Sequence, residues 1–143
     1  MATAKKVAPK SAGAQDAIGL LTADHREVKA LFQTYEKLAQ DKSNASDRQA
    51  LAETICDMLT IHATVEEEIF YPAARKATQD DGLIDEAEVE HAVAKDLIAQ
   101  IKDMGPQDDL YDAKVKVLSE QIDHHVEEER ARCSRWRGNL RLT

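Results

Sequence analysis

The sequence contains few of the residues that break helices, cross-link small domains or build sheets. It has 5 glycines, 3 prolines and 2 cysteines in 143 residues, and aromatic residues make up 4%. This composition is typical of a helical bundle, not of a sandwich or a barrel. Cys56 and Cys133 are far apart and lie outside any CxxC motif, so we expect neither a disulfide scaffold nor a thiolate zinc site. The length fits a single domain, and we predict the all-α class.

Long apolar runs are also missing. No stretch is long and apolar enough to cross a bilayer, and the N-terminus has no run that resembles a signal peptide. We therefore expect no membrane partner and, by default, a cytoplasmic location. The net charge of −8 argues against non-specific binding of nucleic acid by the body of the protein.

Charge and composition divide the chain into three parts. Residues 1–15 are rich in Ala, Lys, Ser and Pro, and we predict a disordered lead-in. Residues 16–129 contain the helical pattern described next. Residues 130–143 have five arginines and no acidic residue, whereas the whole chain has 27 acidic residues. This atypical basic tail is a diverged end, a segment that contacts nucleic acid, or the product of a shifted reading frame, and the sequence leaves these three open.

Apolar residues recur with alternating steps of three and four along four segments. The first segment covers 16–40, and the second begins at a capping box formed by Ser46 and Gln49 and is kinked or ended by Pro72. The third follows a turn at 79–82, and the fourth begins near residue 108 after Gly105 and Pro106. Helices of this period joined by short loops predict an up-down-up-down four-helix bundle. The inward positions are Ile18, Leu21, Val28, Phe32 and Tyr35; Leu51, Ile55, Met58, Val65 and Ile69; Ile84, Ala87, Ala94, Ile98 and Ile101; and Tyr111, Val115, Leu118 and Ile122.

Four of the five histidines fall on these inward faces, one on each helix. They are His25, His62, His91 and His125. Glu66 follows His62 by one turn, and Glu129 follows His125 by one turn, so each glutamate shares a face with its histidine. His124 is rotated by about 100° from His125 and belongs at the rim. Because the inward faces of a bundle converge, these imidazoles and carboxylates should meet in its core.

This constellation predicts a buried metal site. An H-x-x-x-E motif alone is weak, and a single core histidine is more often structural, but four in phase on four helices are a different case. Without a cation, each unpaired buried charge costs several kcal/mol or is neutralised. Mixed imidazole and carboxylate ligands suit iron, zinc or manganese, and a carboxylate can bridge two ions. Glu67 and Glu88 are weaker candidate ligands. A ferritin-like site needs two E-x-x-H motifs, and the chain has one, Glu88 to His91.

In these motifs the chain resembles the hemerythrin-like, or HHE cation-binding, domain family. The resemblance extends over residues 16–129 and rests on 23–28, 62–72, 85–91 and 124–129, which supply the ordered set H, H-x-x-x-E-E, H and H-x-x-x-E. It implies a bundle around two non-haem iron ions joined by an oxo or hydroxo bridge. Carried over by position, the terminal nitrogen ligands are His25, His62, His91 and His125, and the bridging carboxylates are Glu66 and Glu129.

Members of this family bind dioxygen, sense oxygen or iron, or respond to nitric oxide and peroxide stress. Oxygen carriers have H-x-x-x-H on the third helix, whereas here Lys95 follows His91, which leaves six protein ligands and argues against reversible oxygen carriage. We therefore predict a di-iron protein that binds or senses O₂, NO or iron under oxidative or nitrosative stress. The alternatives are a di-iron enzyme that acts on peroxide or NO, and a metal-free structural bundle.

Overall fold

The computed structural model describes residues 14–41, 44–78 and 81–140, with the side chains of 14–18, 133 and 135–140 left undescribed. Residues 1–13 of the predicted lead-in therefore lie outside the described residues. Five α-helices and one π-helical turn follow one another: α1 (Ala14–Gln40), α2 (Ala45–Val65), η1 (Glu66–Phe70), α3 (Tyr71–Thr78), α4 (Asp81–Asp103) and α5 (Tyr111–Leu140).

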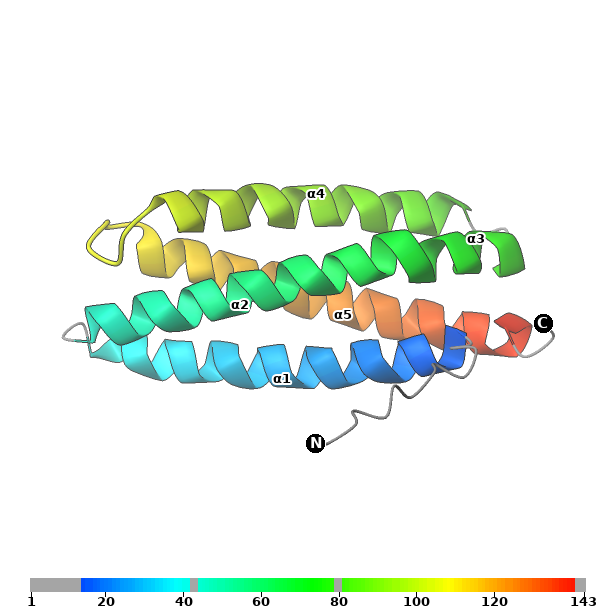
Figure 1. The fold of residues 1–143 in the computed structure, drawn as a ribbon, viewed down its shortest axis with the longest axis horizontal. Helices are drawn as coiled ribbons and strands as arrows, with labels where there is room; N and C mark the ends of the chain where they lie inside the picture. Colours follow the sequence, from blue (N-terminus) through cyan, green and yellow to red (C-terminus); the bar gives the residue numbers. More distant parts are fainter. Residues whose placement is uncertain (1–13, 42–43, 79–80, 141–143) are drawn as a thin grey trace, which may run out of the picture.

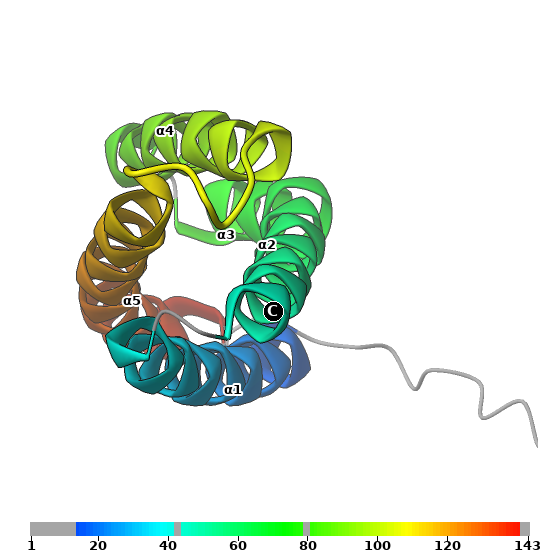
Figure 2. The same ribbon diagram turned by 90° about the vertical axis from the view of Figure 1, so that its left-hand side faces the viewer.

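These elements form four rods, because α2, η1 and α3 follow each other without a loop. The rods lie side by side along a common long axis (Figure 1). Seen from the end, α1 neighbours α2 and α5, and α4 lies opposite α1 (Figure 2). The described residues contain no β-strand. The prediction of an all-α, up-down-up-down four-helix bundle is confirmed. Among these helices, none has the length and apolar character that a membrane span requires.

The helix ends follow the predicted breaks closely, with one correction. The capping box at Ser46 and Gln49 is wrong, because α2 already starts at Ala45 after Asn44, whose side chain makes no capping hydrogen bond. Gly105 and Pro106 follow the end of α4, as expected from the loss of a backbone donor at proline. The last helix does not stop before the basic tail: α5 runs through it to Leu140.

The π-helical turn η1 changes which residues face the core after His62. The prediction that Ile69 faces inward is wrong: its side chain is 60% exposed, while Phe70 and Tyr71 are each 1% exposed. A π turn contains more residues per turn than an α turn, so it advances the inward face by one position. The same turn brings the chain to Pro72 without ending the rod. The backbone N–H of Tyr71 reaches the carbonyl of Glu66, five residues back.

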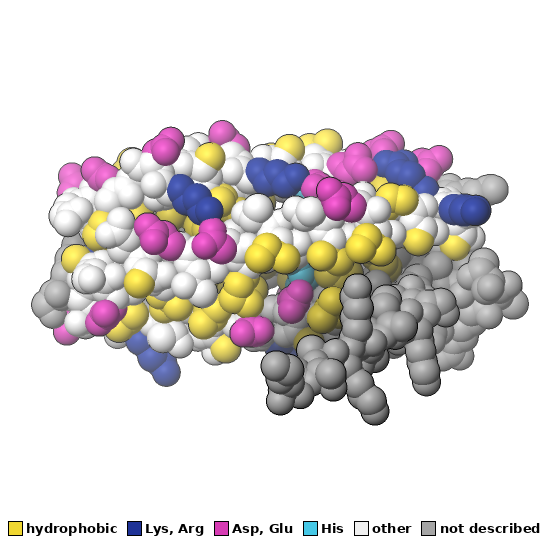
Figure 3. Space-filling view, viewed as in Figure 1, with side chains coloured by type: hydrophobic (Ala, Val, Ile, Leu, Met, Phe, Trp, Pro, Cys, Tyr) yellow, Lys and Arg dark blue, Asp and Glu magenta, His cyan; other side chains and the backbone are white. Residues whose placement is uncertain are grey.

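Two apolar cores pack on either side of a polar layer. The larger core contains Phe32, Ile55 and Leu118, and the smaller contains Leu21, Phe70 and Ile84. The four inward histidines lie between these cores: on three rods each histidine is flanked in the sequence by residues of both cores, and on α5 His125 follows the residues of the larger core. Burial of the two cores aligns the helices, and the alignment brings the histidines to the same level. On the outside, acidic and basic side chains are spread among apolar ones (Figure 3).

Candidate metal centre

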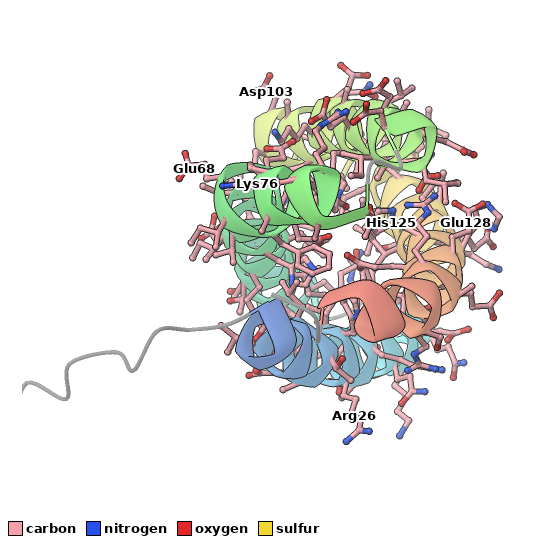
Figure 4. The ribbon with its side chains drawn as sticks, turned by 90° about the vertical axis from the view of Figure 1, so that its right-hand side faces the viewer. Arg26, Glu68, Lys76, Asp103, His125 and Glu128 are labelled. Carbon is pink, nitrogen blue, oxygen red and sulfur yellow. The ribbon has the colours of Figure 1, made fainter. Side chains whose placement is uncertain are left out.

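The four inward histidines meet in two pairs. The Nε2 atoms of His25 on α1 and His62 on α2 are 3.0 Å apart. The Nε2 atoms of His91 on α4 and His125 on α5 are 3.2 Å apart. His125 lies towards the inside of the bundle, whereas the side chains of Arg26 and Glu68 extend outwards (Figure 4). All four rods thus contribute one imidazole, and each imidazole presents the same nitrogen to the interior.

Glu66 and Glu129 lie between the two histidine pairs. Oε1 of Glu66 is 2.5 Å from Nε2 of His62 and 3.8 Å from Nε2 of His91. Oε2 of Glu129 is 3.2 Å from Nε2 of His25 and 3.8 Å from Nε2 of His125. Each carboxylate therefore reaches one histidine of each pair. In each glutamate the same oxygen faces both pairs, so each carboxylate lies where it could contact a cation at either pair.

Neither carboxylate is satisfied by the protein alone. All four carboxylate oxygens of Glu66 and Glu129 are buried without an aligned hydrogen-bond donor. Burial raises the pKa of Glu129, and the neighbouring Glu66 raises it further. For Glu66, burial acts in the same direction, but Glu129 and His62 outweigh it and hold its pKa below the ordinary value. A buried pair of this kind shares a proton, or it is neutralised by cations. The donor set thus fits metal ions.

The imidazoles also have unusual proton affinities. Burial opposes protonation of His62, but Glu66 and Glu129 outweigh it and raise its pKa. Burial and the neighbouring His125 lower the pKa of His91 to about 4. At neutral pH His91 is therefore an uncharged imidazole, the form that binds metals. Facing nitrogen atoms 3.2 Å apart need a proton or a cation between them.

Ligand atoms of two groups of residues lie within 4.8 Å of one another. The first group is His25, His62, Glu66 and Glu129, and the second is Glu66, His91 and His125. Together they contain all six residues that the sequence predicts, and Glu66 belongs to both. A third group, Glu86, Glu90 and Glu128, is more exposed, and Arg132 lies 2.9 Å from Glu128 and 3.4 Å from Glu90. This arginine already supplies a cation to the third group.

A cavity of about 240 Å³ borders the histidines on the side of the larger core. Its walls include buried apolar side chains such as Val28, Leu59 and Ile98, and it also reaches exposed residues of α4 and α5, among them Val93 and His124. A space of this size holds a molecule of a few atoms. Its mostly apolar walls favour uncharged ligands.

Tyr71 approaches the centre from the other side. Its hydroxyl lies 3.3 Å from Nε2 of His91, and the two rings are 5.5 Å apart. Burial raises the pKa of this phenol above its ordinary value, and the charges of Glu66 and Glu129 raise it further. In the metal-free protein Tyr71 is consequently a protonated hydrogen-bonding group, held there by the register of the π turn.

The remaining candidates lie outside the two groups. Glu67 is not among the inner ligand atoms but faces the outer nitrogen of His91, at 3.4 Å. Glu88 lies at the surface, 3.5 Å from Arg75. The side chain of His124 is 69% exposed, as expected for a rim residue.

Sequence reasoning missed Asp24, Glu90 and Arg132, which surround the histidines. Asp24 and Glu90 directly precede His25 and His91, the one signal that could have identified them.

Comparison with known proteins gives one match. The model of the family described as Hemerythrin HHE cation binding domain matches residues 16–132. No curated protein and no solved structure matches the chain. The matched segment contains all six residues that converge between the two cores.

Proposed function

The chain belongs to the hemerythrin HHE cation-binding domain family, and from this premise we propose that it holds two non-haem iron ions that bind a small ligand such as O₂ or NO. The proposed ligands are nitrogen atoms of His25, His62, His91 and His125 and carboxylate oxygens of Glu66 and Glu129. Zinc or manganese suits the same donor set. Bound iron would supply one-electron chemistry and an exchangeable coordination position.

The observation that supports two ions best is the position of the carboxylates. Glu66 reaches from His62 to His91, and Glu129 reaches from His25 to His125. A single ion bound at one histidine pair would not require a glutamate that also reaches the other pair. Two ions, one at each pair, would place positive charge next to both buried carboxylates and relieve the cost of leaving them unpaired. A metal-free structural bundle would have to bear that cost.

Lys95 supports a ligand-binding role rather than a coordinatively complete site. It stands one turn after His91, where oxygen carriers have a fifth histidine, yet its Nζ lies 2.7 Å from Glu67 and the residue is exposed. The protein thus offers six ligands, and the cavity beside the histidines provides room for a small uncharged molecule. We propose binding or sensing of O₂ or NO in oxidative or nitrosative stress. Turnover of peroxide or NO is the alternative.

Metal counting tests the centre directly. Purified under air, the protein should contain two iron ions per chain and show the near-ultraviolet and visible bands of a bridged diferric pair. His62→Ala and Glu66→Ala should lose metal and bands together. His124→Ala is the matched control, because this exposed histidine lies outside the ligand groups. One ion, zinc alone, no metal, or equal loss in the control contradicts the proposal.

Titration of the reduced, iron-loaded protein separates the functions. A stoichiometric spectral change with O₂ or NO that reverses when the gas is removed indicates binding or sensing. Repeated consumption of peroxide or NO by one equivalent of protein indicates an enzyme. A reduced protein whose spectrum none of the three molecules alters contradicts both.

A further inference from the structure

The outer nitrogens of three of the four histidines face carboxylates. Nδ1 of His125 lies 2.6 Å from Glu90, and Nδ1 of His91 lies 3.4 Å from Glu67. Nδ1 of His62 lies 3.5 Å from Asp24. In each case Nε2 points to the centre and Nδ1 points away. A carboxylate at the outer nitrogen fixes the ring orientation, holds the proton on Nδ1, and leaves Nε2 free to bind a cation.

Two of these carboxylates are in turn held by cations. Lys95 donates hydrogen bonds to both oxygens of Glu67, at 2.8 and 2.7 Å. Arg132 lies 3.4 Å from Oε1 of Glu90, while the other oxygen of Glu90 faces His125. Arg132 is itself 5% exposed and is additionally paired with Glu128 at 2.9 Å. Each carboxylate therefore stays ionised and has little freedom to turn away from its histidine.

The other histidine pair lacks this support. Asp24 is at the long distance of 3.5 Å from His62, and among the side chains described in 19–41, 44–78, 81–132 and 134 no salt bridge joins it to a lysine or arginine. No hydrogen bond from Nδ1 of His25 is found among these described side chains. The two halves of the centre thus differ in their surroundings although each has two histidines. His91 and His125 are held from outside, and His25 and His62 are held mainly from inside.

We infer that Glu67 with Lys95 and Glu90 with Arg132 are positioning pairs that make the His91–His125 half of the centre the tighter of two unequal metal positions. The inference rests on the proposed function, since it concerns the same two ions. Lys95, which is not a ligand, would hold Glu67 in place, and Arg132, a residue of the basic tail, would hold Glu90 in place. Neither residue touches the ions. Both act through a carboxylate on a histidine.

Stepwise metal titration tests this inference. Metal-free protein is titrated with Co²⁺, a spectroscopic probe for both positions. In Glu90→Gln and Glu67→Gln, one of the two ions should bind roughly 10- to 100-fold more weakly, and the other should be unchanged. Glu68→Gln and Glu127→Gln are the controls: Glu68 is the exposed neighbour of Glu67 in the same run, and Glu127 is an exposed glutamate of α5, the helix that carries His125. Loss of affinity for both ions alike, or for neither, overturns the inference.

Rescue separates positioning from folding. Arg132→Lys should retain most of the affinity that Arg132→Met loses, and Lys95→Arg should do the same relative to Lys95→Met. Thermal unfolding of the metal-free variants should not follow the same order. The midpoint potential of the iron-loaded centre should rise in Glu90→Gln, because an imidazole without its carboxylate donates less charge to iron. Equal losses in Lys and Met variants, or an unchanged potential, argue against positioning.

A measurement without metal keeps this inference distinct from the proposed function. In ¹⁵N-edited proton spectra of the metal-free protein, the proton on Nδ1 of His125 should give a strongly downfield resonance that disappears in Glu90→Gln. If the parent protein binds fewer than two Co²⁺ ions, the proposed function is overturned, and this resonance still decides whether Glu90 positions His125. If it binds two ions and the variants match it, only the positioning role is overturned.

Discussion

Lys95 donates hydrogen bonds to both carboxylate oxygens of Glu67, at 2.8 and 2.7 Å. Glu67 in turn faces Nδ1 of His91 at 3.4 Å, so Lys95 meets this histidine through a carboxylate. A cavity of about 240 Å³ borders the same histidines, so the proposed metal ions would have room for an exchangeable ligand.

Replacing Lys95 with histidine tests this consequence. We expect Lys95→His to weaken azide binding to the oxidised, iron-loaded protein, because an added imidazole on the face of His91 fills an exchangeable position. Lys95→Gln removes the charge without adding a metal ligand and is the control. Azide affinity is measured by spectral titration. The same weakening in Lys95→Gln would mean that loss of the Glu67 contact, not added coordination, is the cause.

The register of the π turn predicts opposite effects at two neighbouring residues. Phe70→Ala should lower the free energy of unfolding by about 3–5 kcal/mol, because Phe70 is 1% exposed in the smaller core. Ile69→Ala should change it by less than about 0.5 kcal/mol, since its side chain is 60% exposed. Urea unfolding of the metal-free proteins measures both. A larger loss of free energy in Ile69→Ala than in Phe70→Ala would indicate an uninterrupted α-helix in which Ile69 faces the core.

A polar cluster at the other end of the bundle should affect stability without affecting metal. Asp112 accepts hydrogen bonds from Arg48 at 2.7 Å and Tyr35 at 2.6 Å, and Arg48 is buried. We expect Asp112→Ala to lower the free energy of unfolding by roughly 1.5–3 kcal/mol, as removal of a bond to a charged group does. Asp109→Ala, at an exposed position, is the control. Iron content should stay at the parent value in both variants, and a loss of iron in Asp112→Ala would contradict this separation.

Acid should destabilise the metal-free protein through His91. Its pKa is lowered to about 4 from an ordinary value of 6.5 by burial and by His125. Between these pH values His91 is protonated in the unfolded chain but stays neutral in the folded protein. The contribution of neutral His91 to the free energy of unfolding is therefore lost as the pH falls from about 6.5 to 4. His62, with a raised pKa, acts in the opposite direction.

Urea unfolding from pH 7 to pH 4 in the presence of a chelator measures this effect. The decline in the free energy of unfolding should be shallower in His91→Leu than in the parent protein. His124→Ala should follow the parent curve. Parallel curves for all three proteins would show that protonation of His91 does not drive the loss of stability.

The meeting of six side chains follows from the sequence alone, and the reason is local. Helical period places His25, His62, His91 and His125 on inward faces, and the spacing of four residues adds the glutamates. Short loops then fix the alternation of the rods. These inward positions depend only on the geometry of one helix and the burial of its apolar face, so they can be predicted without a tertiary structure.

What lies around the histidines depends on other helices. The partner of His125 is Glu90, 35 residues away, and the partner of Glu90 is Arg132, 42 residues away. Ile69 and Phe70 exchange places because one turn of helix has a π geometry.

The sequence by itself determined the bundle and the convergence of four imidazoles and two carboxylates, since those depend on a period within each helix. Only the tertiary structure decided that Lys95 binds Glu67, that Glu66 and Glu129 lie between both histidine pairs, and that the pairs have unequal surroundings. Those features depend on side-chain rotamers and on distances between rods, which no single helix encodes.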